Sequence, residues 1–242
     1  MYNGHAVNLW YNQSMEKILL RKQNGYEVPC IAEFPAGLRK LVIVIHGYDS
    51  SKESENAANL MRLLPQEGFD GPGRFGVIAY DQPNHGSEQA AAEPLSIDAC
   101  LDSLAMVENY LAERFPGVEI CYFGSSFGAY LLGISLIQRP HRGSKAFMRC
   151  AAVNFPELDI DERARALEPV DLFALFQQAR PEDVRFAFAH GACDSSVPVE
   201  AAIAFTEQFG YPLTIFPGEE HPICTYPESP LRVAQLAAEL FE

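Results

Sequence analysis

The chain has 242 residues, a formal net charge of −14 and a hydrophobic content of 48%. This length and composition suit one large α/β domain with a substantial core, and they argue against a disordered chain. The negative charge argues against nucleic acid or an anionic membrane surface as a partner, because both are bound through basic patches.

The sequence also lacks the usual signals for export, membrane insertion or metal binding. No apolar run approaches the roughly 20 residues that a membrane helix needs, and Met1–His5 carries no Lys or Arg and leads into no hydrophobic signal core. We therefore expect a cytoplasmic protein. The six cysteines are scattered without a Cys-x-x-Cys pair, so we expect free thiols, no zinc site and no cofactor.

Taken in order, the chain predicts a hairpin followed by alternating strands and helices. The hairpin pairs residues 17–21 with 26–34 around the turn signal Asn24-Gly25. Further strands are expected at 41–45, 76–80, 120–123, 147–153, 184–189 and 213–216, and helices at 54–68, 95–115, 127–138, 157–167, 170–179, 199–209 and 231–241. This alternation predicts a mostly parallel central sheet with helices on both faces, in a single domain over residues 1–242.

One stretch carries a chemical motif. A short apolar run ends in Gly124-Ser125-Ser126-Phe127-Gly128, and a helix-compatible segment follows. Gly-x-Ser-x-Gly between a strand and a helix is typical of a nucleophile elbow, in which small residues flank a serine in a strained turn. The glycine spacing selects Ser126, and not Ser125, as the nucleophile. The free N–H of Phe127 at the start of the next helix can then stabilise an oxyanion.

A serine nucleophile needs a base to take its proton and an acid to orient that base. Ser126, Asp194 and His221 occur in the order nucleophile, acid and base, each just after an expected strand. Because active sites of open α/β sheets gather at the carboxyl ends of the strands, we predict that these three residues form a catalytic triad. The competing interpretations are that Asp194 only caps the next helix and that His221 is a surface loop residue.

The oxyanion hole needs a second N–H group, which the loop after the first long buried strand supplies in this arrangement. Within His46-Gly47-Tyr48 we predict that Tyr48 provides it, since a loop with one glycine is not a multi-glycine oxyanion loop. We interpret His46 and His85 as residues that shape their loops, and we assign no function to His190.

On these motifs the chain from about Leu41 onward resembles the α/β-hydrolase superfamily. His46–Glu53 is similar to the oxyanion loop of small bacterial carboxylesterases, including cinnamoyl (feruloyl) esterases, and Asp81–Ser87 is similar to a second loop of that family. The resemblance implies an α/β-hydrolase fold in which residues 154–182 form a short cap. Within that cap we expect Phe155 and Leu158 to line an acyl or aromatic pocket above Ser126. The competing interpretation is that they only anchor the cap to the sheet.

The sequence thus predicts a serine hydrolase that cleaves carboxylic esters of modest size through an acyl-enzyme. Its substrate would be a small-molecule ester, and the reaction requires neither metal nor cofactor. A thioesterase or a small peptidase would use the same triad. A non-catalytic hydrolase-like binding protein, or a redox enzyme that uses Cys193 beside Asp194, would also fit parts of the sequence. The sequence does not indicate an oligomeric state.

Overall fold

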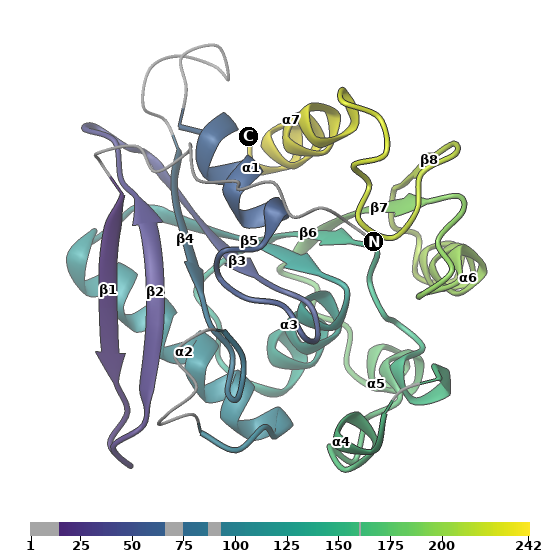
Figure 1. Ribbon diagram of the computed structural model, residues 1–242, viewed down its shortest axis with the longest axis horizontal. Coiled ribbons are helices and arrows are strands. Elements are labelled where there is room, and N and C mark those ends of the chain that lie inside the picture. The colour runs from purple at the N-terminus through teal and green to yellow at the C-terminus, as the bar shows by residue number, and fades with distance from the viewer. Residues whose placement is uncertain (1–14, 66–74, 87–92, 160) are drawn as a thin grey trace, which may run out of the picture.

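The computed structural model describes residues 15–65, 75–86, 93–159 and 161–242. Within these ranges eight strands form one sheet, in the spatial order β1-β2-β4-β3-β5-β6-β7-β8 (Figure 1). Their bounds are β1 Glu16–Arg21, β2 Glu27–Glu33, β3 Lys40–Ile45, β4 Phe75–Tyr80, β5 Glu119–Ser125, β6 Lys145–Arg149, β7 Arg185–Gly191 and β8 Leu213–Phe216. The hairpin strands β1 and β2 run antiparallel to their neighbours, and the other strands are mutually parallel.

Helices cover both faces of this sheet (Figure 1). On one face α1 (Glu55–Leu63) and α7 (Ser229–Phe241) lie side by side, and on the other lie α2 (Ile97–Arg114), α3 (Phe127–Gln138) and α6 (Val199–Phe209). The predicted mostly parallel sheet with helices on both faces is therefore confirmed. No helix in the part of the chain that the structure describes is both long and apolar enough to cross a membrane.

The central strands are buried because almost every side chain on them is apolar. All residues of β3 and β4 are buried, so each strand contributes to one hydrophobic core above the sheet and another below it. A strand buried on both faces has the continuous β-branched run that Leu41–Ile45 shows. This burial holds the carboxyl ends of β3 and β5 in register, with Ile45 beside Gly124.

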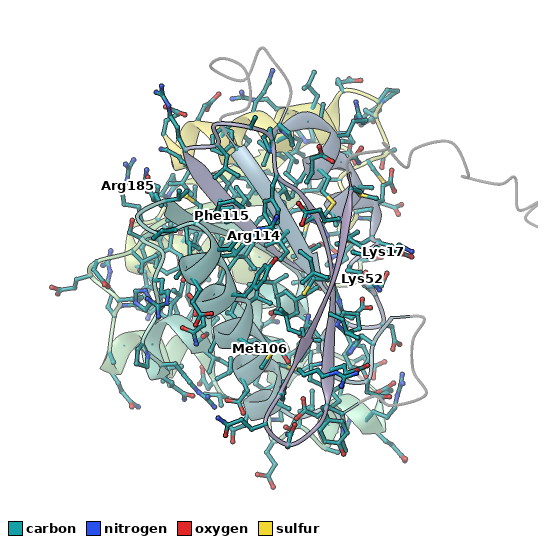
Figure 2. All side chains as sticks on the ribbon, turned by 90° about the vertical axis from the view of Figure 1, so that its left-hand side faces the viewer. Lys17, Lys52, Met106, Arg114, Phe115 and Arg185 are labelled. Carbon is teal, nitrogen blue, oxygen red and sulfur yellow. The ribbon has the colours of Figure 1, made fainter. Side chains whose placement is uncertain are left out.

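The hairpin is fixed to the rest of the domain through the end of α2. Arg114 donates two hydrogen bonds to the carboxylate of Glu16 on β1, at 2.6 and 2.8 Å, and its guanidinium lies 4.8 Å from the ring centre of Phe34. Figure 2 views the molecule from this side and labels Arg114 and Phe115. An ion pair and a cation–π contact therefore attach the hairpin to the C-terminal end of α2.

Most of the predicted helices begin and end within a few residues of their expected bounds, because local capping signals determine them. Ser54 accepts a hydrogen bond from the N–H of Ala57 at the start of α1, and Ser96 accepts one from Ala99 at the start of α2. The α6 helix ends at Gly210, which has the left-handed conformation expected of a helix C-terminus. Residues 66–68 of the first predicted helix, and Ser87 of the second loop, lie outside the described residues.

Two predicted elements are wrong in their extent. The strand expected at 147–153 is β6, which begins at Lys145 and ends at Arg149, because Cys150 has a φ of 43° and turns the chain out of the sheet. Residues 150–153 are nevertheless buried, so the apolar sequence indicated burial and not strand structure. The helix expected at 157–167 is instead a 3₁₀ turn, η2 (Phe155–Glu157), and a short helix, α4 (Glu162–Arg165).

The break between η2 and α4 has a local cause. Leu158 is extended, with a ψ of 152°, and ends the 3₁₀ turn. Asp161 then starts α4 by accepting a hydrogen bond from the N–H of Ala164 at 2.9 Å. The helix α5 (Leu172–Gln178) completes the segment 154–182 and packs against α3.

Candidate active site

The centre of the site is the sharp turn between β5 and α3. Ser126 stands between the last strand residue, Ser125, and the first helical residue, and it has a φ of 54°, which is strained for a residue with a side chain. A Cβ on Gly124 would lie 2.6 Å from the Cα of Ala129, and one on Gly128 would lie 2.2 Å from the carbonyl oxygen of Ile45. Both glycines are therefore required by the close approach of main chain to main chain.

Hydrogen bonds from the neighbouring elements stabilise this strained turn. The N–H of Ser126 donates to the carbonyl of Arg149 at the end of β6, at 2.9 Å. The carbonyl of Ser126 accepts from the N–H groups of Ala129 at 3.0 Å and Tyr130 at 3.1 Å. The side chain of Ser126 is therefore held at the carboxyl edge of the sheet, at the N-terminus of α3.

The loop after β3 lies directly against Ser126. A Cβ on Gly47 would lie 3.2 Å from the Cβ and 3.7 Å from the Oγ of Ser126. Among the hydrogen bonds of the described residues, none uses the N–H of Phe127 or of Tyr48. These are the N–H groups predicted to stabilise an oxyanion, and Phe127 follows Ser126 directly while Tyr48 follows Gly47.

The ring of His46 stabilises the conformation of this loop through two hydrogen bonds. Its Nδ1–H donates to the carbonyl of Gly47 at 2.7 Å, and its Nε2 accepts from the N–H of Gln82 at 3.1 Å. Burial lowers the pKa of His46 to about 3, so the ring is neutral and both ring nitrogens are already used. The ring centre of His85 lies 5.2 Å from that of His46 and 5.7 Å from that of Tyr48, where it packs against both.

Asp194 and His221 meet after β7 and β8. The Nδ1 of His221 lies 2.7 Å from Oδ2 of Asp194, and the side chain of Asp194 is fully buried. The other carboxylate oxygen accepts hydrogen bonds from the N–H groups of Ser196 and Val197, both at 2.9 Å. Burial alone would raise the pKa of Asp194, but its hydrogen bonds outweigh burial and hold the pKa well below its usual range. The acid is therefore ionised and faces the imidazole.

His190 also contacts this carboxylate, although no motif in the sequence singles it out. Its side chain is only 1% exposed, and its Nε2 lies 2.9 Å from the carbonyl of Val197 and 3.2 Å from Oδ2 of Asp194. A carbonyl can only accept, so Nε2 carries the proton and the ring donates toward both oxygens. The only signal in the sequence was its place near the end of β7, which puts it at the edge of the sheet where Asp194 also lies but does not by itself indicate the contact.

Arg149 is the second residue that sequence reasoning missed. It is 3% exposed, and its guanidinium donates from Nε to the hydroxyl of Ser125 at 2.9 Å and from Nη1 to the carbonyl of His221. A charged residue inside an otherwise apolar run was the signal that could have found it.

Ser126 and His221 are not hydrogen-bonded to each other. Within the part of the chain that the structure describes, no hydrogen bond joins the hydroxyl of Ser126 to the ring of His221. Such bonds are often long without substrate, and Arg149 links the two sides of the site instead.

One set of side chains near the site could hold a metal ion. Ligand atoms of Cys150, Asp194 and His221 lie within 4.8 Å of one another. However, Nη1 of Arg149 lies 3.8 Å from Sγ of Cys150, and this positive charge repels a cation. Burial also raises the pKa of the Cys150 thiol to about 11, which disfavours the thiolate that a metal would bind. The surroundings therefore favour the hydrogen bond between Asp194 and His221 over metal ligation.

The residues predicted to line a pocket lie in different environments. Phe155 is 2% exposed and packs against the rings of Phe127 and Tyr130, each with a centre 4.9 Å away. Leu158 is only partly buried. The segment 154–182 also touches the loop after β3, since the hydroxyl of Tyr48 donates to Asp161 at 2.9 Å.

Comparison with known proteins identifies the fold in which these residues lie. The family model described as "alpha/beta hydrolase fold" matches residues 40–202. No curated protein matches the chain significantly.

Several solved structures share the architecture. Est1E from Butyrivibrio proteoclasticus with ferulic acid bound is 18% identical, with a TM-score of 0.75 over 93% of this chain and 99% of that one. XC6422 from Xanthomonas campestris, described as an a/b serine hydrolase without lid, is 15% identical, with a TM-score of 0.70 over 96% and 95%. The esterase Pf2001 from Pyrococcus furiosus is 16% identical, with a TM-score of 0.73 over 94% and 91%. At these identities the likeness shows the fold.

Proposed function

Because the chain belongs to the α/β-hydrolase family, we propose that it is a serine hydrolase that cleaves carboxylic esters of modest size through an acyl-enzyme. Membership confirms the resemblance and the fold class that the sequence predicted. The observation that carries the proposal is the buried, ionised Asp194 hydrogen-bonded to His221 at the sheet edge where Ser126 occupies a strained turn.

The geometry suits the usual division of roles in such a reaction. Donation from Nδ1–H of His221 to Asp194 leaves Nε2 with a lone pair that can accept the proton of Ser126. The serine oxygen attacks the ester carbonyl, and the N–H groups of Phe127 and Tyr48 stabilise the negative oxygen that forms. His221 returns the proton to the leaving alcohol, and a water molecule then hydrolyses the acyl-enzyme by the same route.

The proteins with similar folds support the choice of substrate class. One of them is named an esterase, one a serine hydrolase, and one holds ferulic acid. A small-molecule ester, with an aliphatic or an aromatic acyl group, is therefore the first substrate class to test.

The test compares p-nitrophenyl esters, acyl-CoA thioesters and aminoacyl p-nitroanilides, alongside labelling by a fluorophosphonate probe. We expect labelling of the protein and the highest kcat/KM on the esters. Preference for the thioesters or the anilides would replace the esterase with a thioesterase or a peptidase. A folded protein that neither labels nor turns over any substrate would instead be a binding protein.

The pH dependence of the reaction tests the base. A neutral imidazole is needed to accept the proton of Ser126, and an unperturbed imidazole titrates at about 6.5. The pKa of Asp194 lies below its usual range, so this carboxylate stays ionised throughout the assayed pH range. Its titration therefore does not add a second ionisation to the pH profile of kcat/KM. We expect kcat/KM to rise along a single ionisation between about pH 6 and 8 and then to level off. A flat profile from about pH 5 to 9 would exclude a histidine base.

The cap residues should separate into two kinds when each is truncated. Leu158→Ala should change the ratio of kcat/KM between short and long acyl esters by about tenfold, because one methylene in a pocket changes discrimination by that order. Phe155→Ala should instead lower stability by about 3–5 kcal/mol, because the ring is buried against Phe127 and Tyr130. Chain-length profiles and melting temperatures of both variants check this. If Leu158→Ala moves only the melting temperature, it does not line the pocket.

A further inference from the structure

The buried guanidinium of Arg149 contacts both sides of the proposed site. Arg149 is the last residue of β6 and pairs in register with Ser125 on β5, which brings its side chain beside the serine hydroxyl. Both Nε and Nη2 donate to that hydroxyl, with the Nε distance 2.9 Å, and Nη1 donates to the carbonyl of His221. The carbonyl of Arg149 itself accepts the N–H of Ser126 at 2.9 Å.

This positive charge is buried without the partner that such a charge normally has. Over the described ranges, no carboxylate oxygen lies within ion-pair distance of Arg149, while other buried cations such as Lys22 and Lys52 have one. Burying a guanidinium without a carboxylate is unfavourable, and hydrogen bonds to a hydroxyl and a carbonyl offset only part of that penalty. A role in packing alone would be filled better by an apolar side chain.

The hydrogen bond from Arg149 to the carbonyl of His221 connects the loop of His221 to the elbow, whereas the nearby hydrogen bonds of that loop lead elsewhere. Nearby, the N–H of Cys193 donates to the carbonyl of Glu219 at 2.8 Å, and the Glu219 carboxylate accepts from Thr225 and Tyr226. Those contacts fix the loop to itself and to the end of β7. In the described part of the chain, Arg149 is the residue that bonds to the main chain of His221 and connects it to the elbow.

We propose that Arg149 is a positioning residue that holds the loop of His221 against the nucleophile elbow, so that the imidazole stays aligned with Ser126 during the reaction. The inference rests on the proposed serine-hydrolase function. Arg149 acts through the main chain of His221 and through Ser125, and it contacts neither substrate nor the transferred proton. A shift of about 1 Å in a catalytic group can lower the rate by about 10²-fold, so the effect should fall on kcat.

The experiment measures kcat and KM on a p-nitrophenyl ester for Arg149→Ala and Arg149→Lys, below the melting temperature of each variant. We expect Arg149→Ala to lower kcat by about 10²-fold with KM within about threefold, because the alignment of the reacting groups is lost while the pocket remains. Arg149→Lys, or methylguanidinium added to Arg149→Ala, should restore part of kcat. The matched control is Arg142→Ala, because that arginine bonds to Asn109 at 2.8 Å on the surface and should leave kcat unchanged.

The outcomes distinguish this inference from the function on which it rests. If the unaltered protein neither hydrolyses esters nor reacts with a fluorophosphonate, the proposed function fails first. If the unaltered protein is active and folded Arg149→Ala keeps kcat within about threefold, only the role of Arg149 fails. A loss of kcat that neither Arg149→Lys nor methylguanidinium restores would also overturn it. Should Arg149→Ala not fold, Arg149→Gln is judged by the same criteria.

Discussion

Replacement of Ser126 by alanine should abolish ester hydrolysis, with kcat lower by about 10⁴-fold or more, because no other group at the elbow can form the acyl-enzyme. Ser125→Ala should retain activity within about tenfold of the unaltered protein. The hydroxyl of Ser125 accepts hydrogen bonds from Arg149, and its residue belongs to β5 and not to the strained turn. The two adjacent serines therefore form a matched pair of substitutions.

Three measurements check this prediction. Turnover of a p-nitrophenyl ester gives kcat, fluorophosphonate labelling reports the nucleophile directly, and circular dichroism reports whether each variant is folded. We expect Ser126→Ala to be folded, unlabelled and inactive. Equal loss of activity and of labelling in both folded variants would show that the nucleophile is not fixed by the glycine spacing.

Asp194→Asn should lower kcat by about 10³–10⁴-fold while leaving the fold intact. The amide oxygen can still accept from the N–H groups of Ser196 and Val197, which leaves the NH₂ group facing His221. Nδ1 of His221 would then have to accept, so the proton would move to Nε2. In that tautomer the imidazole cannot take the proton of Ser126.

Single-turnover and steady-state kinetics of Asp194→Asn, with Asp159→Asn as the control, test this assignment. The carboxylate of Asp159 is solvent-exposed and lies 3.5 Å from the guanidinium of Arg165, so its loss should leave kcat unchanged. A nearly silent Asp194→Asn would mean that the acid lies elsewhere. Asp161, which is within hydrogen-bond reach of Tyr48, would be the next residue to replace.

The parts of this structure that the sequence predicted well are those determined by short stretches of chain. The strand β3 is a continuous apolar run, and the elbow combines Gly124, Ser126 and Gly128 within five residues, so each can be recognised without knowing its neighbours in space. The approach of Asp194 to His221 followed from a general property of parallel sheets, since both residues come just after a strand.

The parts that the sequence did not reveal depend on which strands pair and in which register. Arg149 reaches Ser125 only because β5 and β6 are neighbours with these two residues aligned. His190 reaches Asp194 because the chain folds back after β7, and a position four residues away does not indicate that. The predicted C-terminal end of β6 was wrong for a related reason, because residues 150–153 are apolar but lie in a buried loop and not in the strand.

The close packing of Gly128 against the end of β3 also affects how much the N–H groups near Ser126 must reorient during the proposed reaction. A Cβ at this position would collide with the carbonyl oxygens of Ile45 and His46, so no side chain separates the two main chains. Exposed side chains change rotamer within nanoseconds. Two main-chain segments packed directly against each other, as here, have no side chain between them that could move in this way. The N–H groups of Phe127 and Tyr48 belong to these two segments, so their separation is set when the chain folds. In the proposed reaction, the developing negative charge would therefore meet N–H dipoles that are already oriented. The free energy needed to orient them would be spent when the chain folds, and not again in each turnover.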